Sequence, residues 1–91
     1  AAYTLIQNTY DVGEFDDVEK MVYDFAAKAG SQNYWLAKAY IVLGDAFAEQ
    51  DNLAQAKATF ESIASGYEPT GPEDDVLDAV RMRLEKLSQM M

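Results

Sequence analysis

Residues 34–67 read YWLAKAYIVLGDAFAEQDNLAQAKATFESIASGY, and this stretch decides the fold. Apolar side chains recur in it at spacings of three and four residues, on both sides of a polar break at residues 50–52. This periodicity is typical of two amphipathic helices joined by a tight turn. Gly44 and Ala56 are small residues that stand where the two helices would approach closely. The apolar stripes are Leu36, Tyr40, Leu43 and Phe47 in the first helix, and Leu53, Ala56, Phe60 and Ile63 in the second.

The residues before this stretch predict another helix pair. An apolar-periodic segment covers residues 1–11, and a turn at residues 11–14 follows it. The next helix starts near Asp16, whose carboxylate can cap it, and ends at Gly30, which can adopt a positive φ. The inward positions of these two helices are Ala2, Leu5, Ile6, Thr9, Val18, Met21, Val22, Phe25, Ala26 and Ala29.

Polar residues mark where the next two helices begin. Ser31 or Asn33 is expected to cap a third helix over roughly residues 33–50. Asn52 is expected to cap the fourth helix, with Gln55 three residues later as its capping-box partner.

A loop and a fifth helix complete the chain. Residues 68–72 contain two prolines and a glycine, which end the preceding helix. Acidic residues then stand in the first turn of the new helix and basic residues further along, and both placements suit the helix dipole. The acidic residues are Glu73, Asp74 and Asp75, and the apolar stripe is Leu77, Val80, Leu84, Leu87 and Met91.

An internal repeat joins these helices into one architecture. A shift of 38 residues places Leu5 on Leu43, Phe15 on Leu53, Val18 on Ala56 and Val22 on Phe60. A further shift of 37 residues places Tyr40 on Leu77, Leu43 on Val80 and Phe47 on Leu84. A helix pair cannot bury its apolar face alone, whereas stacked pairs form a continuous core. The sequence therefore predicts an all-α solenoid of five helices, with two helix pairs and a C-terminal capping helix.

The stretch at residues 34–67 resembles the tetratricopeptide repeat. That motif has a large residue, then Leu-Gly, then an aromatic residue in its first helix, and small and aromatic residues in its second. The matching residues here are Tyr40, Leu43, Gly44, Phe47, Ala56 and Phe60. Ile63 departs from the usual alanine and Pro69 comes one position late. In the preceding pair Ile6 replaces the glycine and Thr9 the aromatic residue.

The resemblance implies a domain organisation. Residues 1–91 would form a single repeat domain, with a degenerate repeat at 1–30, a well-formed repeat at 33–67 and a capping helix at 72–91. Arg81 stands where the last helix would otherwise have a glycine, which suits a terminal helix. The chain is also similar to C-terminal ends of long repeat proteins from bacteria of the Bacteroidetes group. That similarity implies a longer parent protein and, because such proteins are often exported, favours the periplasm or cell envelope.

Composition excludes several classes of function. The chain carries 16 acidic and 7 basic residues, a net charge of −9, which argues against binding nucleic acid or an anionic membrane surface. It has no cysteine and no histidine, so disulfides, thiolate catalysis and histidine acid–base chemistry are absent. No apolar run approaches the roughly 20 residues of a membrane-spanning helix, so we expect no direct membrane insertion.

Candidate chemical sites each have a simpler explanation. The acidic group Glu14, Asp16, Asp17 and Glu19 lacks the spacing of a calcium loop, and a solvated helix start explains it better. No nucleophile, phosphate loop or oxyanion turn accompanies the carboxylates, so we expect no enzyme activity and no cofactor or metal. Trp35 could be a binding hot spot, but we favour packing between repeats.

The resemblance also implies a binding face. First helices of each pair line the concave side of such arrays, which places Lys38, Ile41, Val42, Asp45, Ala48 and Glu49 there. Ile41 and Asp45 occupy positions where a carboxylate-binding subtype has Lys and Asn, so an acidic C-terminal peptide is not expected. An apolar or basic segment of a protein or peptide suits this face better. We therefore expect a non-catalytic protein-interaction scaffold.

Two other functions remain open from the sequence. The helices could be a purely structural end of a longer array, or a helical regulatory domain of a larger enzyme. The first helix lacks a preceding repeat against its apolar face, so we also expect self-association or fraying there.

Overall fold

The computed structural model describes residues 2–28, 33–69, 71 and 74–90, and within these ranges the chain forms five helices and no strand. The predicted all-α class is therefore confirmed for this part of the chain. The helices are α1 (Ala2–Asp11), α2 (Phe15–Lys28), α3 (Asn33–Glu49), α4 (Leu53–Gly66) and α5 (Val76–Met90).

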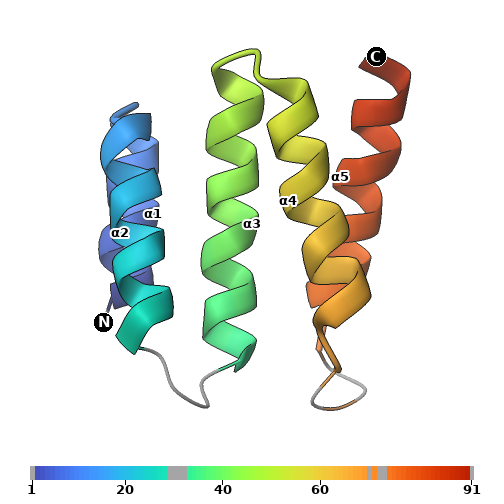
Figure 1. The fold of residues 1–91 in the computed structure, drawn as a ribbon, viewed down its shortest axis with the longest axis horizontal. Coiled ribbons are helices and arrows are strands. Elements are labelled where there is room, and N and C mark those ends of the chain that lie inside the picture. The colour runs from blue at the N-terminus through green and yellow to red at the C-terminus, as the bar shows by residue number, and fades with distance from the viewer. Residues whose placement is uncertain (1, 29–32, 70, 72–73, 91) are drawn as a thin grey trace.

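The helices pack in two layers around α3. Helix α3 contacts all four of the others, with α1 and α2 on one side of it and α4 and α5 on the other (Figure 1). Helices α1 and α5 both contact α3, whereas α2 and α4 do not contact each other in the described residues. The molecule measures 34 × 30 × 19 Å, and the shortest extent corresponds to about two helix diameters of 10 Å each. The first layer therefore contains α1, α3 and α5, and the second contains α2 and α4.

Close contact between α3 and α4 depends on one glycine. A Cβ atom added to Gly44 would lie 2.5 Å from Cε1 and Cζ of Phe60, which is far inside van der Waals contact. Phe60 is 1% exposed and packs in the core, so an added methyl group would have to displace a packed ring. Ala56, on the same face of α4, is also fully buried. The predicted close approach at Gly44 and Ala56 is thus a real feature, in which the aromatic ring of one helix lies on the bare backbone of the other.

The apolar stripes differ from the prediction in the two outer helices. Leu5 was expected to face inward, but it is 60% exposed, while Ile6 is buried and the half-buried Tyr3 and Tyr10 pack against the core. These three residues form a stripe at spacings of three and four, which partly buries two large rings that the predicted stripe would leave outside. In α5, Val76 is buried and Leu77 only half-buried, so the inward face begins one residue earlier than predicted.

The turn between α3 and α4 is made by the backbone. Asp51 has a positive φ of 62°, and the amide of Asn52 donates a hydrogen bond of 2.9 Å to the Phe47 carbonyl. Asn52 is the residue before α4, but its side chain makes no capping hydrogen bond, so the predicted capping box with Gln55 is wrong. A backbone bond of 3.1 Å from the Ala56 amide to the Asn52 carbonyl begins the helix instead.

Three other predicted helix starts are corrected. Helix α2 begins at Phe15, so Asp16 lies inside its first turn and does not precede the helix. Asn33 is the first residue of α3 and not the residue before it. Helix α5 begins at Val76, because the Oδ1 atom of Asp74 accepts a hydrogen bond of 2.9 Å from the Val76 amide. The predicted roles of Ala29, Gly30, Ser31, Glu73 and Met91, and of the Ala2 side chain, lie outside the described residues.

We expect Gly44→Ala to lower the free energy of unfolding by about 1–2 kcal/mol, because overpacking by a methyl group outweighs the gain of up to about 1 kcal/mol in helix propensity. Gly66→Ala is the matched control, since no atom lies within 4 Å of a Cβ built there. Chemical denaturation of both variants measures the difference. Equal stability of the two variants would contradict the close contact with Phe60.

Candidate functional site

A hollow of about 520 Å³ opens between α1, α3 and α5. We name it the α1–α3–α5 groove. Three successive helices of one layer supply its walls, and Phe60 of α4 lies at its base. The residues that line it are Tyr10, Asp45, Ala48, Glu49, Phe60, Arg83, Lys86, Leu87 and Met90.

The two walls of the groove carry opposite charges. Asp45 and Glu49 come from α3, while Arg83 and Lys86 come from α5. Half-buried Ala48 and exposed Met90 add apolar surface, while Leu87 beneath them is buried in the core. The groove therefore offers a carboxylate wall, an apolar surface and a basic wall to anything that lies along it.

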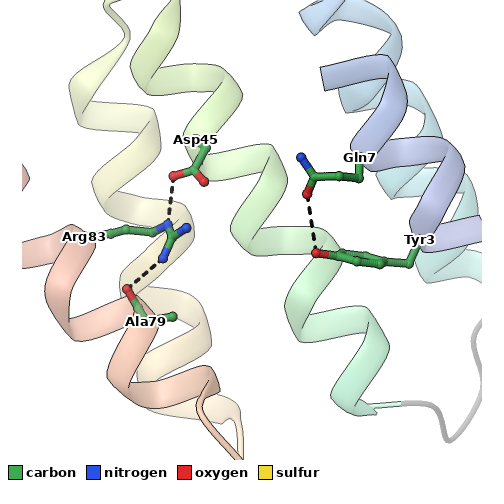
Figure 2. A network of polar contacts seen from close by, with 5 residues as sticks. All are labelled: Tyr3, Gln7, Asp45, Ala79 and Arg83. Atoms are coloured by element: carbon green, nitrogen blue, oxygen red, sulfur yellow. Dashed lines mark hydrogen bonds and ion pairs between the residues drawn. The ribbon is translucent and has the colours of Figure 1, made fainter. Parts of the chain in front are cut away.

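An ion pair holds the two walls together. Nε of Arg83 donates to Oδ1 of Asp45 over 2.9 Å, and Nη1 of Arg83 donates to the Ala79 carbonyl over 3.2 Å (Figure 2). The two charged side chains are 36% and 28% exposed, so solvent screens the pair only in part. This is a link between α3 and α5 over 38 positions of sequence.

Tyr10 brings a titratable group from α1 to the same groove. Burial raises the pKa of its phenol above 10.0, and the nearby carboxylates of Asp45 and Glu49 raise that pKa further. The Arg83 guanidinium opposes them by lowering the pKa. The phenol therefore stays neutral at physiological pH and can donate a hydrogen bond to an acceptor in the groove.

The six residues expected on the binding face fall into three groups. Asp45, Ala48 and Glu49 line the groove. Ile41 and Val42 are 7% and 4% exposed and belong to the core, because α3 contacts all four other helices and has a wider apolar face than a single stripe suggests. Lys38 lies away from the groove, over a group of aromatic rings between α1 and α3.

Sequence reasoning missed the contributions of the outer helices to this groove. Tyr10 of α1 and Arg83, Lys86, Leu87 and Met90 of α5 were not considered as site residues. The internal repeat of the sequence was the signal that could have identified these residues. Residues about one period apart on successive first helices lie side by side in a stacked array, and Asp45 and Arg83 are one such pair.

Trp35 is partly packed and partly free. Its ring lies 5.6 Å from the Tyr3 ring of α1 and 5.2 Å from the Tyr34 ring, measured between centroids. The residue is nevertheless 46% exposed. Trp35 therefore packs between helices at one edge and remains open to solvent at the other.

A second hollow of about 490 Å³ lies between α3, α4 and the segment that follows α4. Leu36, Tyr40, Ile63 and Tyr67 supply much of its surface. The Tyr67 hydroxyl donates a hydrogen bond to Oδ2 of Asp74, which ties the segment after α4 to the start of α5. This hollow therefore adjoins the connection between the last two helices.

Two searches of the described residues gave no site. No group of three or more His, Cys, Asp or Glu side chains there could hold a metal ion. No helix among the described residues is long and apolar enough to cross a membrane.

We expect Arg83→Gln to lower the free energy of unfolding by about 0.5–1 kcal/mol, because it breaks the half-buried pair with Asp45. Arg81→Gln is the matched control, since the pair of Arg81 with Asp78 measures 3.5 Å and is well exposed. Denaturant unfolding of both variants gives the comparison. The interpretation fails if the loss in Arg83→Gln is no larger than that in Arg81→Gln.

We expect the free energy of unfolding to fall as the pH rises above about 10, the usual pKa of a tyrosine. The pKa of Tyr10 is raised in the folded state, so its stabilising contribution is complete below the unfolded pKa and is lost as the pH passes the folded pKa. Tyr10→Phe removes this titration, so its stability should fall less steeply between pH 9 and 11. Thermal unfolding across that range measures the slopes, and identical slopes would rule out the effect.

Comparison of the chain with protein-family models, with curated proteins and with solved structures finds no match. The tetratricopeptide resemblance therefore rests on the residues of the chain itself and stays a prediction.

Proposed function

We propose that this chain is a protein-interaction module of the tetratricopeptide type, and that its α1–α3–α5 groove binds a segment of a partner protein without catalysis. The groove carries the proposal, because three successive helices line a hollow large enough to receive several side chains. Its combination of apolar surface with charged walls is the usual anatomy of a helix- or peptide-binding groove.

The charges of the groove specify the partner segment. Among the described residues Glu49 has no ion pair, and the whole chain has a net charge of −9. A basic side chain of the partner would therefore be attracted along the α3 wall. Apolar side chains of the segment would cover Ala48 and Met90. The best-suited partner is an apolar segment with basic residues, and an acidic residue would fit only beside Lys86.

The alternative to partner binding is a purely structural role, which the exposed outer side of α5 favours. The outer side of α5 is exposed and carries Asp78 and Arg81 as an ion pair and Glu85 one turn further on, with Met82 as an exposed apolar residue among them. Such a face suits the end of an array, because a capping helix must remain soluble on its outer side. In that case the groove would bind nothing.

A display library of helical peptides, selected on this chain, tests the proposal. We expect enriched peptides to combine apolar residues with Lys or Arg, because the groove has that complementarity. Glu49→Lys should weaken binding by about tenfold, as loss and reversal of one interfacial charge costs on the order of 1.4 kcal/mol. Amide chemical shifts in the chain with bound peptide should change at α1, α3 and α5.

Glu61→Lys is the matched control, since Glu61 is an exposed residue of α4 outside the groove. This variant should bind the selected peptides as the parent does, with the same helicity by circular dichroism. Failure to enrich any peptide, or shift changes confined to other helices, would favour the structural role.

A further inference from the structure

Three aromatic rings surround one ammonium group at the end of α1 and α3 opposite to the groove. Nζ of Lys38 lies 5.6 Å from the ring centroid of Tyr3, 5.4 Å from that of Tyr34 and 5.8 Å from that of Trp35. All three distances are within the roughly 6 Å at which a cation is attracted to the face of an aromatic ring. We name the group Tyr3, Tyr34 and Trp35 the aromatic cage.

The rings stand at large angles to one another. Tyr34 and Trp35 meet at 82°, and Tyr3 and Trp35 meet at 48°. The rings are therefore not stacked, and all three centroids lie within 5.8 Å of Nζ of Lys38. The negative faces of three π-systems therefore converge on the space that the Lys38 ammonium group occupies.

Two helices hold the cage in place. Tyr34 and Trp35 are consecutive residues of α3, and Lys38 lies one turn later on the same helix. Tyr3 comes from α1, its ring lies towards α3, and its hydroxyl donates a long hydrogen bond of 3.4 Å to Oε1 of Gln7 on the same helix (Figure 2). Helices α1 and α3 contact each other directly, so the third ring is fixed by tertiary packing.

Lys38 occupies the cage but is a poor ligand for it. A primary ammonium group is strongly hydrated, and its flexible stem gives it many alternative positions in water. A quaternary ammonium group has no N–H to hydrate and carries an apolar surface that ring faces cover well. Trp35 is 46% exposed, so a ligand can approach from solvent. The net charge of −9 attracts cations to the protein in general.

We propose that the aromatic cage of Tyr3, Tyr34 and Trp35 binds a quaternary ammonium group, and that Lys38 is an intramolecular competitor which leaves when the ligand enters. The ligand class is a methylated ammonium, carried by a small molecule such as choline or by a trimethylated lysine side chain. The proposal rests on these contacts alone and does not depend on the function of the α1–α3–α5 groove.

Titration with tetramethylammonium chloride tests the site, because Trp35 is the only tryptophan and its fluorescence reports on the cage. We expect a saturable change with a dissociation constant in the millimolar range, and no such change with sodium chloride at equal ionic strength. Lys38→Ala should tighten binding by about threefold to tenfold, because it removes the competing state. Lys20→Ala, an exposed lysine of α2, is the matched control and should bind as the parent does.

Removal of one ring of the aromatic cage should have the opposite effect on the affinity for tetramethylammonium. Tyr34→Leu should weaken binding by about twofold to fivefold, as expected for the loss of one cation–π contact. Circular dichroism checks that Tyr34→Leu keeps its helices. If this variant loses them, the comparison of Lys38→Ala with Lys20→Ala alone decides whether the cage binds the cation. The absence of a saturable signal in both the parent and Lys38→Ala would overturn the proposal, as would equal affinities in Lys38→Ala and Lys20→Ala.

Choline and trimethyllysine separate the two sources of the ligand. Tighter binding of choline than of trimethyllysine assigns the cage to a small molecule, and the reverse order assigns it to a modified protein side chain. Either order supports the site, whereas binding of neither molecule by Lys38→Ala would count against it.

Discussion

The contact between the Phe60 ring and the backbone at Gly44 sets the geometry of the molecule. It brings α4 so close to α3 at this point that the Phe60 ring leaves no room for a Cβ atom at position 44. Helix α5 contacts both α3 and α4. The position of α4 against α3 therefore decides where α5 can lie, and hence how wide the α1–α3–α5 groove is. Phe60 itself also lines the groove, so a single close-packed pair of residues in the core shapes a feature of the surface.

Sequence patterns predicted the centre of the fold better than its edges. In α3 and α4 the stripes run over several turns and are bounded by clear breaks, so Leu43, Phe47 and Phe60 are buried as expected. Helix α1 is short, and two neighbouring stripes share Ile6. Periodicity alone could not distinguish between these two stripes. The stripe with Tyr3 and Tyr10 faces inward because their rings bury more apolar surface than Leu5 would.

The helix ends were harder to predict, because each depends on one side-chain rotamer. Asn52 has the residue type of a cap but makes no capping hydrogen bond, and the backbone satisfies the turn without it. Asp74 could stand inside the first turn of α5 or before it. The hydrogen bond that its side chain accepts from the Val76 amide places Asp74 before the helix. Residue type alone does not distinguish the two positions, because acidic residues are favoured in both.

The candidate site shows what a single repeat cannot reveal. The well-formed repeat identified Asp45, Ala48 and Glu49 on one face of α3, and these residues do lie in the groove. Tyr10 lies in the predicted degenerate repeat and Arg83 in the predicted capping helix, so their shared location depends on the stacking of helices that the motif describes poorly. Burial of Ile41 has the same origin, because the number of helices around α3 is a tertiary property.

The groove has a mechanical consequence that follows from the order of the helices. In the described part of the chain α1 and α5 do not touch, yet Tyr10 of one and Met90 of the other line the same hollow. A segment bound there would be a brace between two helices that otherwise communicate only through α3. Its binding free energy would appear as resistance of both ends to local opening, so the occupied molecule would exchange its terminal amide hydrogens more slowly than the empty one.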